Sequence, residues 1–204
     1  MASRRPRRTT EPWRPTKEEL AAAAGKTIPD LIAPDLDVLF CGINPGLYSG
    51  TTGHHFAKPG NRFWKTLHLA GFTPRVLSPF EEDELLEYGL GITNLAMRTT
   101  ATAAQLTDEE LREGGVKLAR KLQKYRPKLL AVLGVTAYRA AFGHKKAVLG
   151  PQPEGIGGVP VWVLPNPSGL NAHYQLPDLA ALFGSLRQGL DDPVAGKEPI
   201  DAND

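Results

Sequence analysis

The sequence predicts one domain of the three-layer α/β/α class, in which helices cover both faces of a mainly parallel sheet. Apolar strand segments alternate with helical segments along the chain, and two of the strand segments are continuous apolar runs, as expected for strands buried on both faces. The chain has 204 residues, of which 41% are hydrophobic, enough for the core of one ordinary globular domain. We expect this domain to span residues 31–190.

The two ends of the chain differ from this domain in charge. Residues 1–30 carry seven Lys or Arg and four Asp or Glu. Residues 191–204 carry one Lys or Arg and five Asp or Glu. Thr16 and Glu19 form a capping box that predicts a helix over residues 17–24, so the N-terminal segment is expected to be a partly disordered basic arm with a short helix. The acidic tail has almost no large apolar residues and is predicted to be disordered.

The first half of the domain is predicted as a strand, a loop and two helices. A buried strand over residues 38–41 runs into a Gly and Pro turn, and a polar, Gly-rich loop over residues 47–60 follows. The next helix ends at Gly71 and has one apolar face, made of Phe63, Trp64, Leu67 and Ala70. The segment SPFE then predicts the capped start of a second helix that ends near Gly89.

The second half continues the alternation of strands and helices. The expected elements are a strand ending at Ala96, a helix capped by Thr107 and Glu110 and ending near Tyr125, a buried strand ending at Leu133, the helix VTAYRAAFG, a strand over residues 159–164 and a last helix opened by Pro177. In open parallel sheets, ligands bind beyond the carboxyl ends of the strands. The loops after strands ending at Cys41, Ala96, Leu133 and Leu164 should therefore converge on one crevice.

Two of these loops contain candidate functional residues. In CGINPG, Asn44 projects at the end of a buried strand, although a purely structural turn is the alternative, and the spacing matches neither phosphate-binding glycine loop. In LPNPSGLNAHY, Leu170 would suit insertion into a base stack if it faced the same crevice, and otherwise it would be packed. Phe56 in HHFAKPG could stack on a base or could hold its own loop in place.

Several function classes lack the residues that they need. None of the segments CGINPG, ITNLAMRTT and PNPSGLNAHY contains Asp or Glu, so paired-carboxylate catalysis and a serine triad have no evident position. His54 and His55 are adjacent and should point apart, and Cys41 is a lone thiol, so we expect neither a metal site nor a disulfide. The sequence shows no secretory signal or membrane span, and we expect a soluble cytoplasmic protein that works on bacterial-type nucleoid DNA.

Three segments together resemble a known family. The runs FCGINPGLYSGTTGHHFAKPGNRFWKTLHLAGF, GITNLAMRTT and VWVLPNPSGLN, in this order and spacing, are similar to the mismatch-specific uracil-DNA and thymine-DNA glycosylases. The likeness covers roughly residues 31–190. It implies the uracil-DNA glycosylase fold and hydrolysis of the bond between a flipped base and its deoxyribose without a metal or cofactor.

The resemblance also implies roles for individual residues. Asn44 matches the catalytic asparagine that positions the attacking water, and Phe56 matches the aromatic that stacks on the flipped pyrimidine. The remaining matches are Ile43, Ser49, Asn94 and Asn166 in the base pocket and Gly169, Leu170 and Asn171 in the wedge that fills the duplex and touches the widowed guanine.

The sequence departs from the family in two places. Relatives usually carry an arginine soon after the wedge, whereas this chain reads GLNAHY, so His173 or Tyr174 would have to replace it. At position 94 the asparagine matches the thymine-DNA branch rather than the lysine frequent in bacterial mismatch-uracil enzymes. The arm residues Arg4, Arg5, Arg7 and Arg8, with His173, are expected to contact the DNA backbone, although a solvated arm without a partner is the alternative.

The function expected from sequence is thus a monofunctional DNA glycosylase of base excision repair. A base inside a duplex must be extruded before chemistry, at a cost of a few kcal/mol that is least for a mismatched base. The expected substrate is double-stranded DNA with uracil, thymine or etheno-cytosine opposite guanine, bound by a monomer. A noncatalytic module that binds DNA mismatches is the alternative, and a small-molecule hydrolase would need an acid or base that these loops lack.

Overall fold

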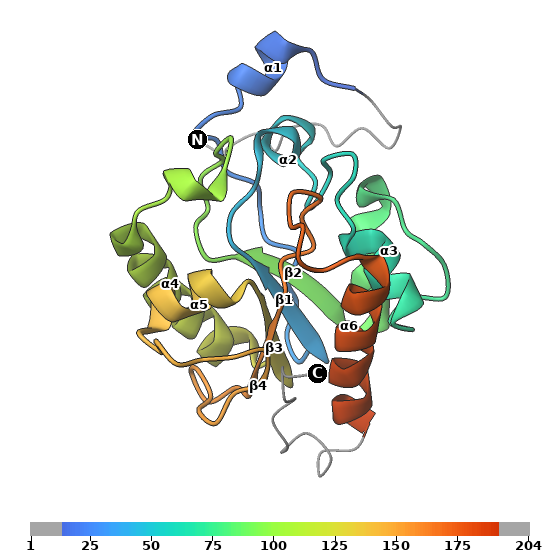
Figure 1. Cartoon of the computed structure of the whole chain (residues 1–204), viewed down its shortest axis with the longest axis vertical. Coiled ribbons are helices and arrows are strands. Elements are labelled where there is room, and N and C mark those ends of the chain that lie inside the picture. The colour runs from blue at the N-terminus through green and yellow to red at the C-terminus, as the bar shows by residue number, and fades with distance from the viewer. Residues whose placement is uncertain (1–13, 192–204) are drawn as a thin grey trace.

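A five-stranded sheet forms the centre of the molecule (Figure 1), whose computed structural model describes residues 14–191. The strands are β1 (Val38–Gly42), β2 (Leu90–Asn94), β3 (Leu129–Leu133), β4 (Gly150–Pro151) and β5 (Val161–Leu164), and their order across the sheet is β2-β1-β3-β5-β4. Strands β2, β1, β3 and β5 are parallel, and β4 pairs with β5 in the antiparallel direction. The predicted mainly parallel sheet is confirmed.

Helices cover both faces of this sheet. They are α1 (Lys17–Ala21), α2 (Leu47–Thr52), α3 (Phe63–Leu69), the 3₁₀ helices η1 (Pro79–Tyr88) and η2 (Ala103–Gln105), α4 (Asp108–Tyr125), α5 (Val135–Phe142) and α6 (Leu176–Asp191). Side chains of α3, η1 and α6 form one core with the first sheet face, and side chains of α4 and α5 form a second core with the other face (Figure 1). The predicted three-layer architecture is therefore present.

Strand β1 shows why the apolar runs must lie between two helical layers. All five of its residues are buried, and successive side chains point to opposite faces. Phe40 packs edge-on against Phe63 of α3 and stacks on Phe183 of α6, with ring centroids 5.5 and 5.9 Å apart. Leu39 and Cys41 pack on the opposite face, in the core formed with α4 and α5.

Helix boundaries follow the capping signals of the sequence. The three predicted capping boxes, Thr16 with Glu19, Ser78 with Glu81 and Thr107 with Glu110, are all formed. Gly89 ends η1 in the left-handed conformation, with φ of 69°, which glycine adopts without steric cost. These helix starts and the end of η1 are confirmed.

Five details of the structure differ from what the sequence predicts. Residues 47–60 were expected to be loop but begin with α2, a six-residue helix too short to show an apolar period. The regular ladder of β2 ends at Asn94 rather than Ala96, and β5 begins at Val161 because Pro160 has no N–H to donate to a ladder. Helix α1 ends at Ala21, and the two-residue strand β4 was not predicted because so short a segment has no periodicity.

The segment before β1 closes an edge of the sheet. Leu31 forms an antiparallel bridge with Ile92 of β2, and its amide donates to the Ile92 carbonyl over 2.9 Å. Asp30 accepts hydrogen bonds from Thr93 and from Lys121 of α4, over 2.8 and 2.6 Å. Ile28 is buried as well, so this segment packs against the domain.

The predicted boundary at residue 30 stays a prediction, and the expected disorder of residues 1–13 and of the tail from residue 192 lies outside the described residues. Within residues 14–191, no helix is long and apolar enough to span a membrane.

The contact between α4 and the chain after β2 yields a stability prediction. A Cβ added at Gly114 would lie 2.3 Å from the Leu95 carbonyl oxygen, which is backbone and cannot rotate away. We therefore expect Gly114→Ala to lower the free energy of unfolding by about 1–3 kcal/mol, although alanine normally favours a helix by about 1 kcal/mol over glycine. Urea denaturation measures the change.

Gly184→Ala on α6 is the matched control, because nothing lies within 4 Å of a Cβ added there. This variant should be as stable as the wild type or more stable. A Gly114→Ala protein with raised stability would contradict the close approach of α4 to Leu95.

Candidate functional site

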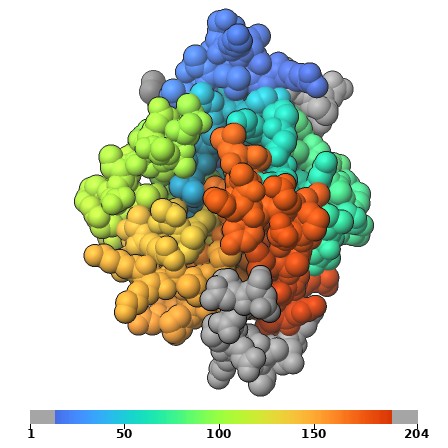
Figure 2. All heavy atoms as spheres, in the orientation of Figure 1, coloured from blue at the N-terminus to red at the C-terminus, as the bar shows by residue number. Residues whose placement is uncertain are grey.

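A pocket lies beyond the carboxyl ends of β1, β2 and β5. The sequence predicts that four loops converge here, and the fourth, after β3, contributes no residue to the lining that the structure describes. The pocket has a cavity volume of about 140 Å³. Seven of the predicted site residues line it: Ile43, Asn44, Ser49, Phe56, Asn94, Asn166 and Leu170. Figure 2 shows a hollow on this face, bounded by the cyan segment after β1, the green segment after β2 and the orange segment after β5. Segments far apart in the sequence thus meet at one site.

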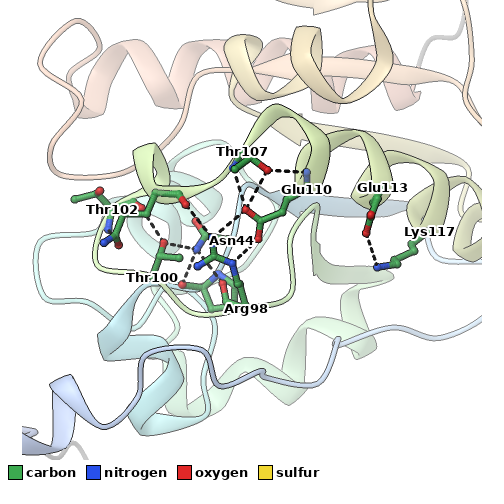
Figure 3. Close-up of polar contacts among 10 residues, drawn as sticks. Asn44, Arg98, Thr100, Thr102, Thr107, Glu110, Glu113 and Lys117 are labelled. Carbon is green, nitrogen blue, oxygen red and sulfur yellow. Dashed lines mark hydrogen bonds and ion pairs between the residues drawn. The ribbon is translucent and has the colours of Figure 1, made fainter.

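Asn44 is held at the pocket in one orientation. The two hydrogens of its Nδ2 group are shared among three acceptors, the carbonyls of Pro45 and Arg98, both at 3.1 Å, and Thr100 Oγ1 at 2.7 Å (Figure 3). The two carbonyls can only accept, so they fix which end of the amide faces them. Thr100 uses its own hydroxyl hydrogen on the Thr102 carbonyl. Among the described residues, none donates to Asn44 Oδ1, which leaves this oxygen available to accept a hydrogen bond.

The loop that holds Asn44 is itself anchored to α4. Arg98 forms a bidentate ion pair with Glu110, and its guanidinium also donates to the Gln105 carbonyl over 2.8 Å (Figure 3). Glu110 accepts from the Thr107 amide as well, as part of the helix cap. The hydrogen bond from Arg98, followed by that from the Thr107 backbone, lowers the pKa of Glu110 from 4.5 to about 2. The anchor is therefore ionised at neutral pH.

Phe56 packs inside the molecule and also lines the pocket, and its stacking on a base stays a prediction. Its ring stacks on Phe63, with centroids 4.1 Å apart and planes 26° from parallel, and it also lines the pocket. Its backbone is left-handed, with φ of 52°, an uncommon conformation for a residue with a Cβ. The Ala57 amide donates to Ser49 Oγ over 3.2 Å, which ties this loop to α2.

A buried carboxylate supports the same loop. Glu82 is completely buried, accepts from the His55 amide over 2.8 Å and lies 3.2 Å from His54 Nδ1. The acidic run at residues 81–84 is typical of a solvated helix start, and the sequence gives no sign that one of its side chains is buried. The prediction that His54 and His55 point apart agrees with their different partners, since the His55 ring reaches Pro29.

Asn94 and His55 form a chain that orients the Asn94 amide. His55 Nε2 lies 3.0 Å from the Pro29 carbonyl, which can only accept, so a hydrogen is on Nε2. Asn94 Nδ2 lies 3.5 Å from His55 Nδ1. Asn94 Oδ1 then faces Gly42, where an added Cβ would lie only 2.6 Å away. The pocket therefore presents a carbonyl oxygen at this position.

The remaining predicted residues lie in the loop between β5 and α6. Asn166 Oδ1 accepts from the Ser168 amide, and Asn171 Nδ2 donates to the Asn166 carbonyl, both over 3.0 Å. Leu170, at the tip, is 75% exposed and forms part of the pocket rim.

Three further predicted residues, Gly169, Asn171 and His173, do not line the pocket. Gly169 and Asn171 belong to the same turn, and His173 is exposed with its amide on Asn171 Oδ1. Arg4, Arg5, Arg7 and Arg8 lie outside the described residues.

The structure adds lining residues that sequence reasoning missed. They are Ile28, His55, Lys58, Asn61, residues 100–103 and Ser168. Ile28 comes from residues 1–30, which were expected to be an arm outside the domain, and no local motif indicates that this segment packs against the sheet. Of the described residues that line the pocket, none is Asp or Glu, and residues 14–191 contain no group of three His, Cys, Asp or Glu side chains suited to a metal ion.

Comparisons with known proteins agree with this architecture. The sequence model of the uracil DNA glycosylase superfamily matches residues 29–187. A solution NMR structure from Methanosarcina acetivorans, described as a "putative Uracil DNA glycosylase", is similar over 80% of this chain and 98% of that chain, with 19% sequence identity and a TM-score of 0.53. At this identity the second likeness supports the fold alone.

The anchor of the Asn44 loop generates a pH-dependent prediction. Because the folded-state pKa of Glu110 is depressed to about 2 from 4.5, the ion pair contributes stability above the higher value and loses it as the pH falls through the lower one. At about pH 6 the melting temperature of wild type should therefore be higher than that of Glu110→Gln, and this difference in melting temperature should disappear near about pH 2. Thermal melting across this range measures it; a difference that stays constant with pH would contradict the pairing.

Proposed function

The chain belongs to the uracil DNA glycosylase superfamily, and from this premise we propose that it excises a mismatched or damaged pyrimidine from duplex DNA. The bond hydrolysed is the N-glycosidic bond between a flipped base and its deoxyribose, which leaves an abasic site. Uracil opposite guanine is the proposed substrate, with thymine and etheno-cytosine in the same position as further candidates. The observation that carries the proposal is the Asn44 amide, held in one orientation at the pocket with an available oxygen.

The chemistry follows from what an amide can do. As the glycosidic bond breaks, the base leaves with the electron pair and the sugar becomes electron-deficient. A water oxygen bonds to the anomeric carbon and releases its proton to solvent, and the departing base anion takes up a proton from solvent. Asn44 Oδ1 accepts a hydrogen bond from that water and orients it, but an amide cannot take up the proton as a carboxylate does. Catalysis therefore rests on orientation of the water rather than on a strong base.

The base pocket suits a flat, polar ring. Phe56 offers a ring for stacking, and its contact with Phe63 holds that ring in position. Asn94 Oδ1 is placed to accept from an N–H of the base, since its Nδ2 is directed to His55. Ser49 and Asn166 already use their side-chain oxygens on backbone amides, so they shape the pocket wall.

Leu170 is the proposed wedge. A large apolar side chain that is 75% exposed at a pocket rim fits the space left in the base stack by an extruded nucleotide. Lys58, exposed and also at the rim, is placed to contact a phosphate, as is proposed for the arm arginines at positions 4, 5, 7 and 8. We further propose that the enzyme is monofunctional and acts as a monomer.

The assay of the proposed function uses labelled duplexes with a single G:U or A:U pair. Wild-type protein should release uracil from G:U, and strands should break at the abasic site on heating in alkali. Asn44→Ala should lower the single-turnover rate by about a hundredfold or more, because the water loses its orienting acceptor. The variant loses the hydrogen bonds of Nδ2 and should melt somewhat below wild type, but it should remain folded at the assay temperature and keep its affinity for DNA.

Two outcomes of this assay count against the proposal. Binding to G:U without any base release by wild type would favour the noncatalytic mismatch-binding module. Full single-turnover activity in Asn44→Ala would show that this amide does not direct the water.

The space above Gly42 supplies a second test. A Cβ at this position would lie 2.6 Å from Asn94 Oδ1 and 3.3 Å from the Phe56 ring, within the proposed base pocket. Gly42→Ala should therefore reduce excision from G:U by about tenfold or more, since displacing pocket groups by as little as about 1 Å is costly. Gly184→Ala adds the same methyl group outside the pocket and should retain wild-type activity. Equal activity of the two variants would argue against base binding at Gly42.

A further inference from the structure

Arg62 connects the start of α3 to the loop that carries Leu170. Its guanidinium donates to the carbonyls of Ser168 and Tyr174, to the Asn171 carbonyl over 2.8 Å and, more weakly, to Pro167 at 3.5 Å. In Figure 1 the orange segment that leads into α6 passes beside the start of α3. The contacts therefore join positions more than a hundred residues apart in the chain.

The acceptors of Arg62 are all backbone oxygens. Within the part of the chain that the structure describes, no carboxylate forms an ion pair with Arg62, and its side chain is half-buried. A planar group with five N–H donors in a fixed fork can hold several carbonyls in one mutual geometry, which a lysine cannot do. Arg62 thus fixes a backbone conformation rather than neutralising a charge.

The loop needs such support because it has little regular structure of its own. It lies between β5 and α6, and its internal bonds are short-range, such as that from the Asn171 amide to the Ser168 carbonyl. Leu170 projects from this turn into solvent and packs on no core. Without the Arg62 contacts, the tip would have few interactions to hold it over the pocket.

Two further contacts join the same pair of segments. The Arg62 amide donates to the Pro167 carbonyl over 3.0 Å, and a Cβ on Gly169 would lie 2.7 Å from the Gly60 carbonyl oxygen. Phe63, the next residue, stacks on Phe56 in the pocket. The proposed wedge and the proposed base platform are thus attached to the same point, the start of α3.

We propose that Arg62 is a positioning residue for base flipping, which holds the Leu170 loop in the conformation that enters the duplex. This inference rests on the proposed function. Arg62 does not touch the substrate; it acts through the loop by ordering it before DNA binds, so that less ordering is required in the flipped complex. Loss of Arg62 should therefore impair extrusion of a paired base more than the bond cleavage that follows.

The test compares two substrates under single-turnover conditions. One duplex carries a G:U pair, and the other carries uracil opposite an abasic-site analogue, where no base opposes extrusion. Arg62→Met should lower the ratio of the two rates, G:U over unpaired uracil, by about tenfold, as Leu170→Ala should. Arg62→Lys should behave like Arg62→Met, because one ammonium group cannot reproduce the fork.

Arg187→Met is the matched control. Arg187 on α6 also donates to a backbone carbonyl, that of Gly71 at the far end of α3, and it does not line the pocket. This variant should keep the wild-type ratio. A role of Arg62 in stability alone would lower the melting temperature and both rates together, with no change in their ratio.

The outcomes separate this inference from the proposed function. If wild type excises uracil and both Arg62 variants keep its rate ratio, the inference is overturned; if Arg62→Met does not fold, Arg62→Lys decides. If wild type excises nothing, the proposed function fails. The role of Arg62 is then tested by the fluorescence of 2-aminopurine placed beside the G:U pair, which increases when protein binds and flips the base. A smaller increase with the Arg62 variants than with wild type supports a role in flipping, and an equal increase overturns it.

Discussion

The parallel pairing of β1 with β2 and β3 is the constraint on which the site depends. The register places Gly42 opposite Asn94, so the turn after β1 and the turn after β2 leave the sheet at the same edge. Pairing of β5 with β3 brings the loop that carries Asn166 to the same edge. Both helical layers are needed to keep these apolar strands buried, and the pocket lies beyond the carboxyl ends of three of them.

The chemical character of the site follows from how its polar groups are used. The Asn44 amide nitrogen is occupied by protein acceptors, the Asn94 nitrogen is directed to His55, and Asn166 closes its own turn. The cavity is lined by these amides, the Phe56 ring, His55 and Lys58, without a carboxylate among the described lining residues. Under the proposed mechanism, such a site orients a water molecule and has no carboxylate to take its proton.

Much of this arrangement could be predicted from the sequence, because its signals are local. Continuous apolar runs predict buried strands, and a Ser or Thr three residues before Glu predicts each capped helix start. The supports of the site could not be predicted in this way. Glu82 sits in an acidic run that resembles a solvated helix start, and Arg62 bonds to backbone carbonyls, which have no sequence signature. Ile28 reaches the pocket because its segment covers the free edge of β2, and this pairing depends on tertiary structure.

If cleavage of the glycosidic bond is slow, as the proposed mechanism implies, the rigidity of the Phe56 and Leu170 loops affects how long a base stays flipped. A flipped base either returns to the stack or is cleaved, and under the proposed mechanism an amide accelerates cleavage only by orientation, so return competes strongly. A wedge that is already ordered slows the return without adding any contact to the reacting atoms. Under the same proposal, selectivity would arise where extrusion is least costly, at mismatched pairs. The shared attachment of Phe56 and of the Leu170 loop at the start of α3 would then keep the proposed base pocket and the proposed wedge in a fixed relative position during the reaction.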